Sequence, residues 1–104
     1  MSDIKTVAAS FASGKPARCH NAKTDGRSYW LHGHRIATFD DVEDLPKESI
    51  YQGYALASYD WCGWFTKTTA NHLNHIAKAL DARGSRFSYA LARDGKAPVK
   101  GYFK

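Results

Sequence analysis

The residues with the clearest chemical potential lie just before a periodic apolar segment. Thr66, Lys67, Thr68 and Thr69 are expected at the start of a helix, because hydroxyl side chains favour that position. Threonine hydroxyls, an ammonium group and the unpaired backbone N–H groups of a helix start together favour an anion such as phosphate. The alternative is that the threonines only cap the helix and Lys67 is solvated. Both interpretations place a polar turn here.

The histidines are the second candidate for chemistry. Two of them lie two positions apart, expected on one face of a strand, and two others lie three positions apart on the predicted helix. Either spacing brings a pair of imidazoles toward one metal ion, but no third ligand accompanies either pair, and the two cysteines fall at no zinc spacing. We therefore expect no metal and no other cofactor. The histidines are His20, His32, His34, His72 and His75, and the cysteines are Cys19 and Cys62.

Aromatic residues are interleaved with basic residues along much of the chain. On a sheet, such rings stack on nucleic-acid bases while the cations hold phosphates. The alternative is that most of the rings form the core. The aromatic residues are Tyr29, Trp30, Tyr51, Tyr54, Tyr59, Trp61, Trp64, Tyr89 and Tyr102, and the nearby cations are Arg27, Arg35, Lys67, Arg86, Arg93 and Lys100.

The net charge of the 104 residues is +5, and it is unevenly distributed. Residues 40–48 contain five acidic residues and one lysine, so the rest of the chain is strongly basic. A basic body suits a polyanion or an acidic protein surface, although ordinary solubility accounts for a charge of this size equally well. The acidic segment lacks the alternating ligands of a calcium loop and is expected to be a solvated loop.

The elements that position these residues start with a short helix over residues 3–13, ending at Gly14. Segments 17–24 and 27–39 flank Asp25-Gly26, a dipeptide typical of tight hairpin turns, and are predicted to be two strands. Gly33 would mark a bulge or a close backbone approach within the second strand. Residues 50–61 are predicted to be the third strand.

The second half begins with the main helix, predicted from Thr68 or Thr69 as N-cap to Arg83, with Gly84 after its end. Leu73, Ile76, Ala77 and Leu80 form its apolar side. Segments 86–92 and 97–103 are predicted to be strands joined at Asp94-Gly95. The expected order is β-β-β-α-β-β, a single α+β domain over residues 1–104, with an antiparallel sheet of about five strands packed by one main helix.

Two segments resemble a known group of sequences. Residues 24–37 contain a Leu-His-Gly-x-x-Ile-Ala strand, and residues 62–69 contain Gly-Trp-x-Thr-x-Thr-Thr, followed by Leu73-Asn74. This order is similar to that of small, uncharacterised proteins encoded by tailed bacteriophages, over roughly residues 24–77. The group usually has basic residues early in the helix, where this chain has Ala70, Asn71 and His72. The resemblance implies a phage origin, and phage proteins of this size often bind and inhibit host machinery.

From these patterns we expect a small, basic, non-enzymatic protein that binds nucleic acid through a basic aromatic surface. The first alternative is a phage inhibitor of a host protein, such as a CRISPR–Cas nuclease or another nucleic-acid-handling enzyme, and the second is a metal-dependent nuclease. The residues expected to contact the nucleic acid or the partner are Trp64, Thr66, Lys67, Asn71, His75 and Lys78.

The sequence also bounds the location of the protein. No segment is long and apolar enough to cross a membrane, and the first residues lack the pattern of a signal peptide. We therefore expect a cytoplasmic protein, in the host cell if it is phage-encoded, with no membrane partner. Edge strands such as 17–24 or 97–103 would allow a homodimer through strand pairing.

Overall fold

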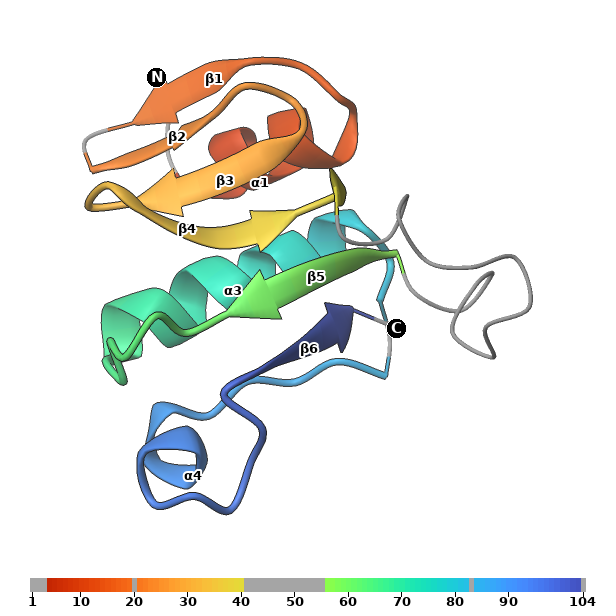
Figure 1. The fold of residues 1–104 in the computed structure, drawn as a ribbon. Coiled ribbons are helices and arrows are strands. Elements are labelled where there is room, and N and C mark those ends of the chain that lie inside the picture. The colour runs from red at the N-terminus through yellow and green to blue at the C-terminus, as the bar shows by residue number, and fades with distance from the viewer. Residues whose placement is uncertain (1–3, 20, 41–55, 83, 104) are drawn as a thin grey trace.

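The computed structural model describes residues 4–19, 21–40, 56–82 and 84–103 (Figure 1). The chain is an α+β domain with a six-stranded antiparallel sheet, which confirms the predicted class and adds one strand to the expected count. Its elements follow in the order α1 (Ile4–Ala12), β1 (Ala17–Cys19), β2 (Ala22–Thr24), β3 (Ser28–Leu31), β4 (His34–Thr38), β5 (Ala57–Asp60), α3 (Lys67–Ala79), α4 (Tyr89–Arg93) and β6 (Lys100–Phe103).

The sheet is a meander in which every strand pairs with its neighbour in the sequence. Both long helices lie against one face: α1 packs on β1, β2 and α3, and α3 runs behind the later strands (Figure 1). The short helix α4 lies beyond the edge strand β6. Because the helices cover one face, the described part of the other face is left for polar side chains.

The core between the helices and the sheet is rich in aromatic rings. Tyr29 and Phe11 are fully buried on the α1 side, with ring centroids 5.9 Å apart in an edge-on arrangement. Phe87 packs edge-on against Tyr59, at 4.7 Å, and against Phe103, at 5.4 Å. Edge-to-face ring pairs add stability beyond the area they bury. The rings therefore pack β3 against α1, and pack β5 and β6 against the segment that precedes α4.

Two predicted strands are in fact four. Segment 27–39 turns at His32 and Gly33, whose φ angles of 52° and 81° are typical of a two-residue hairpin turn. The prediction of a bulge at Gly33 was therefore wrong, and the register shift lies between Tyr29 and Trp30. Segment 17–24 likewise folds back on itself, because Cys19 pairs with Ala22. Aromatic and β-branched residues on both sides of His32-Gly33 made segment 27–39 look like one continuous strand.

The prediction of a strand over residues 86–92 was also wrong. Phe87 is held instead by the side chain of Asn74, whose amide group donates to the Phe87 carbonyl (3.1 Å) and accepts from its N–H (3.0 Å). Asn74 thus supplies the backbone bonds that a neighbouring strand would have made, and residues Tyr89–Arg93 form α4. Of the predicted strand 50–61, the structure describes β5. Residues 50–55 and most of the acidic segment 40–48 lie outside the described residues.

The helix ends follow from local capping. Thr66 caps α3, because its side chain accepts the Thr69 N–H (3.2 Å), so the prediction of Thr68 or Thr69 as N-cap was wrong by two or three residues. The helix ends at Ala79 rather than at Arg83. Asp81 takes the left-handed conformation after the end (φ 57°), and the Ala82 N–H bonds the Ala77 carbonyl at 2.8 Å. An aspartate tolerates this backbone better than most residues, which is why no glycine was needed.

The N-terminal helix ends as predicted. Gly14 has a φ of 74°, and the Lys15 N–H bonds the Ser10 carbonyl at 2.8 Å. This turn packs on the β2–β3 turn so closely that a Cβ at Gly26 would lie 2.5 Å from the Gly14 carbonyl oxygen. Gly26 is therefore required both by its φ of 95° and by the approaching backbone.

Candidate functional site

A row of basic and aromatic side chains crosses the first four strands. Arg18 pairs with Lys23, Lys23 with Trp30, and Trp30 with Arg35, so the four side chains share one face of the sheet. We call these four residues the basic row. Ala17, Cys19 and Ala22, the neighbours in β1 and β2, pack on the core instead. The basic row therefore lies on the face that the helices leave uncovered.

Within the basic row, the Lys23 ammonium lies over the Trp30 ring, 5.5 Å from its centroid. A cation at this distance is attracted by the electrons of the ring face. Lys23, Arg18 and Arg35 are exposed, and Trp30 is half-buried with the Lys23 ammonium over its ring, so the indole reaches solvent beside this cation. An exposed cation beside an accessible indole is the arrangement that binds a nucleotide by a phosphate contact and ring stacking.

A shallow groove continues this face across the last three strands. Its volume is about 450 Å³, and its polar lining includes Arg35, Ser58, Asp60, Lys100 and Tyr102. The pairing explains the composition, since Ser58 lies opposite Tyr102 and Asp60 lies opposite Lys100. Groove and basic row meet at Arg35, which belongs to both.

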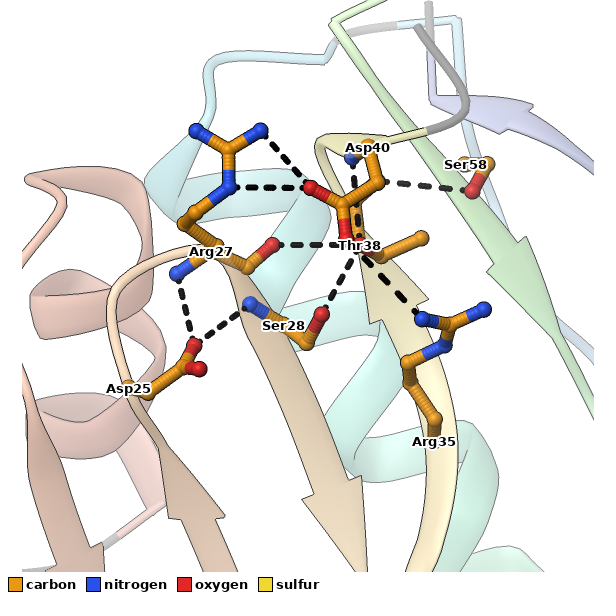
Figure 2. A network of polar contacts seen from close by, with 7 residues as sticks. All are labelled: Asp25, Arg27, Ser28, Arg35, Thr38, Asp40 and Ser58. Carbon is orange, nitrogen blue, oxygen red and sulfur yellow. Dashed lines mark hydrogen bonds and ion pairs between the residues drawn. The ribbon is translucent and has the colours of Figure 1, made fainter.

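A network of hydrogen bonds and ion pairs lies beside the groove, at the end of β4 (Figure 2). Asp40 accepts two bonds from the Arg27 guanidinium, at 2.7 and 2.9 Å, and its second oxygen lies 3.9 Å from Arg35. Below it, the Ser28 hydroxyl donates to the Thr38 hydroxyl oxygen at 2.8 Å, and that oxygen also accepts the Asp40 N–H at 3.1 Å. One carboxylate thus holds two guanidinium groups beside the groove.

The β2–β3 turn carries a second structural carboxylate. Asp25 accepts the Ser28 and Arg27 N–H groups, both at 2.9 Å. These bonds, that to Ser28 first, lower the pKa of Asp25 below its ordinary value because they favour the charged form. Asp25 therefore orders the turn that precedes β3 and positions Arg27.

A third structural carboxylate lies in the groove itself. Asp60 Oδ1 accepts the Cys62 N–H at 2.8 Å and so supports the turn in which Cys62 and Gly63 have φ angles of 56° and 79°. The Cys62 thiol donates to the Arg35 carbonyl at 3.2 Å. Burial raises the pKa of this thiol, with the Asp60 charge adding to the effect, so the cysteine is not activated as a nucleophile.

Three of the six residues predicted to contact a partner lie around the start of α3. Trp64 is 52% exposed, and its ring lies 5.3 Å from that of His34. Thr66 caps the helix and also shares a 3.0 Å bond with the Thr69 hydroxyl, while Lys67 is exposed at the first helical position. The capping interpretation of the threonines therefore accounts for the Thr66 hydroxyl.

The other three predicted residues extend along the helix. Asn71, His75 and Lys78 continue from Lys67 at intervals of four, four and three residues, so the four side chains form one stripe. We call these four residues the α3 stripe. The buried side of α3 faces the sheet, so the α3 stripe points away from it, opposite to the groove. The six predicted residues thus do not converge on one site.

The histidines are arranged differently from the prediction. His32 lies in the β3–β4 turn and His34 at the start of β4, so they do not share a strand face as expected. His72 is 4% exposed and shares a 2.7 Å bond between its Nδ1 and the Tyr29 hydroxyl. Burial lowers the pKa of His72 to about 4, and the charges of His75 and His32 act in the same direction.

The sequence indicated Trp30, Arg35, Lys100 and Tyr102 as aromatic and basic candidates, but their arrangement in rows depends on strand register and was not predicted. The pair Lys23 and Trp30 lies across the turn that contains Asp25-Gly26, but a two-residue turn at that dipeptide would have paired Lys23 with Ser28. The observed loop spans residues 25–28, because Thr24 pairs with Tyr29, and the register is shifted by two residues. The partners Arg18 and Arg35 depend on the two turns that were not recognised. Asp60 and Lys100 lie forty residues apart, and no local signal pairs them.

Across residues 4–19, 21–40, 56–82 and 84–103, no three His, Cys, Asp or Glu side chains gather closely enough to hold a metal ion. None of the helices in these ranges is long and apolar enough to cross a membrane. Comparison of the chain with models of protein families, with curated proteins and with solved structures finds no match.

Proposed function

We propose that this chain is a non-enzymatic protein that binds single-stranded nucleic acid across the open face of its sheet. The observation that carries the proposal is the basic row, in which three cations and one indole lie side by side on four strands. Bases stack on exposed rings of a sheet, and cations beside them hold the phosphates. The groove with Lys100 and Tyr102 extends the same chemistry toward β6.

The network around Asp40 supports this proposal. The Arg27 guanidinium is bonded to the Asp40 carboxylate and that of Arg35 lies 3.9 Å from it, so the three groups together keep a net positive charge. A guanidinium fork suits a phosphate because it donates two bonds to adjacent oxygens. Lys23 has a flexible stem, so it can leave the Trp30 face to an arriving base and bond the phosphate beside it.

The test measures, by fluorescence anisotropy, the binding of a labelled, mixed-sequence oligonucleotide of about 12 nucleotides. We expect affinity to fall steeply between about 50 and about 200 mM salt, because phosphate contacts release counterions. Replacement of Trp30 by Ala should weaken binding about five-fold or more, the loss of one stacked base. Absence of binding at the lowest salt would refute the proposal.

A matched pair of lysines shows which surface binds. Lys23→Ala and Lys78→Ala each remove one exposed lysine, the first from the basic row and the second from the α3 stripe. We expect Lys23→Ala to weaken binding and to reduce the salt dependence by about one phosphate contact, while Lys78→Ala has a smaller effect. Equal effects of the two variants would instead assign binding to overall charge or to the helix.

The second candidate is an inhibitor that binds a host protein, and the exposure of Trp64 favours it. An indole that is half exposed and backed by the His34 ring is the kind of side chain that anchors protein interfaces. The resemblance to phage proteins supports a host nucleic-acid-handling enzyme as the target class. A pull-down from nuclease-treated bacterial lysate should then retain a protein that Trp64→Ala loses. If nuclease treatment removes every retained protein, this candidate fails.

A further inference from the structure

Asp60 is a carboxylate on a surface that we propose binds a polyanion. Among the described residues that line the groove, it is the only acidic one, and it lies opposite Lys100 with Arg35 also in the lining. A carboxylate at this place repels phosphates, so general phosphate binding does not account for it. Its turn-supporting bond to the Cys62 N–H does not account for the charge either, since a neutral amide oxygen accepts the same bond.

The groups around Asp60 complement one edge of a nucleobase. The bond to Cys62 uses one lone pair of Oδ1, and the carboxylate keeps acceptor positions on both oxygens. Lys100 supplies donors next to this acceptor, and the Tyr102 ring, two residues along the same strand, lies on the same side of the sheet. The groove thus offers an acceptor, donors beside it and a ring on which a base can stack.

This pattern distinguishes two bases of the same size. Cytosine presents an amino donor at position 4 next to two acceptors, N3 and O2, whereas uracil presents a carbonyl at position 4 next to an N–H donor. A carboxylate accepts from the cytosine amine and repels the uracil carbonyl. We infer that Asp60 makes the groove a base-reading subsite that takes cytosine in preference to uracil. This inference rests on the proposed function, because it specifies what the same face reads.

The experiment compares two homopolymers, oligo-dC and oligo-dU, of about 12 nucleotides each. Both probes carry the same charge and stack through a pyrimidine ring, so their ratio of affinities isolates the hydrogen-bonding groups at positions 3 and 4. We expect oligo-dC to bind about five-fold more tightly at neutral pH. If both bind equally, the inference fails and the proposed function stands. If neither binds, the proposed function itself fails.

Two variants that each remove one negative charge, one inside the groove and one outside it, show whether the preference for oligo-dC depends on Asp60 or on overall charge. Asp60→Asn keeps an acceptor for the Cys62 N–H but also brings a donor, so we expect the preference for oligo-dC to fall to about parity while both affinities rise. Asp94→Asn removes the same charge from the turn after α4, where Asp94 is exposed beside Arg93 and outside the groove lining, so the preference should persist there.

Three outcomes would overturn the inference. They are loss of the preference in Asp94→Asn, its persistence in Asp60→Asn, and a wild-type ratio near one. Thermal melting checks that each variant is folded. If Asp60→Asn is unfolded, Asp60→Ser provides a second test, because a hydroxyl oxygen also accepts a turn N–H and carries no charge.

Discussion

A histidine in the core makes stability depend on pH. The imidazole of His72 is buried against Tyr29, on the side of α3 that faces the sheet, and its only described hydrogen bond is the 2.7 Å bond to the Tyr29 hydroxyl. In an unfolded chain a histidine has a pKa of about 6.5, whereas burial lowers the pKa of His72 to about 4. The unfolded state therefore binds the proton more readily than the folded state.

Acid therefore destabilises the fold through His72. The contribution of His72 to stability is complete above pH of about 6.5 and is lost as the pH falls toward about 4. We expect the free energy of unfolding, measured with urea, to drop by about 1–2 kcal/mol between pH of about 7.5 and about 5.

The control for this prediction is His72→Gln, which keeps an acceptor for the Tyr29 hydroxyl but does not titrate. The part of the pH dependence that differs between the two proteins belongs to His72, because the other titrating groups are unchanged. Identical pH profiles of unfolding would show that the imidazole does not control acid stability.

At the scale of elements, α3 depends on one capping hydroxyl. Thr66 accepts the Thr69 N–H, whereas Thr68 is exposed and inside the helix. We expect Thr66→Ala to lower the free energy of unfolding by about 1 kcal/mol, because one helix-start N–H loses its partner. Thr66→Ser should retain most of the stability, and Thr68→Ala should change it little. Chemical denaturation of the three variants checks this, and equal losses for Thr66→Ala and Thr68→Ala would contradict it.

The two long helices were predictable from the sequence, whereas the segment before α4 was not. Apolar residues at helical spacing predicted both α1 and α3, because each helix must bury one side on the sheet. Segment 86–92 alternates like a strand, yet the side chain of Asn74 satisfies the backbone of Phe87. That hydrogen bond joins residues thirteen positions apart, so it could not be predicted from the alternating pattern of the segment.

At the scale of the whole molecule, β6 completes the core. Phe103 is fully buried and lies against the rings of Phe87 and Tyr59. We expect Phe103→Ala to lower the free energy of unfolding by about 3–5 kcal/mol, because a ring is removed from a packed site. Val99→Ala is the control, since Val99 is 47% exposed just before the strand and should change stability by less than about 0.5 kcal/mol. Urea unfolding of both variants gives the comparison, and a small loss for Phe103→Ala would show that β6 is dispensable.

The candidate site was the least predictable level of organisation. Composition indicated a basic aromatic surface, but the residues expected to form it were taken from the α3 start and the α3 stripe. The rows on the open sheet face arise from strand register, and register depends on turns such as His32-Gly33. A helix stripe can be read from spacing alone, whereas a row across strands requires every intervening turn to be known.

The pairing of β6 with β5 also sets the order in which the chain can fold during its synthesis. β1 to β5 pair with strands only a few residues to some twenty residues away, so they can pair as they leave the ribosome. The partner of β5 is made forty or more residues later, after two helices. Until then the outer edge of β5 has no strand beside it, and Tyr59 and Phe87 lack the ring of Phe103. A translating chain therefore passes through a stage with an open sheet edge, and ribosome-associated chaperones are most needed at that stage.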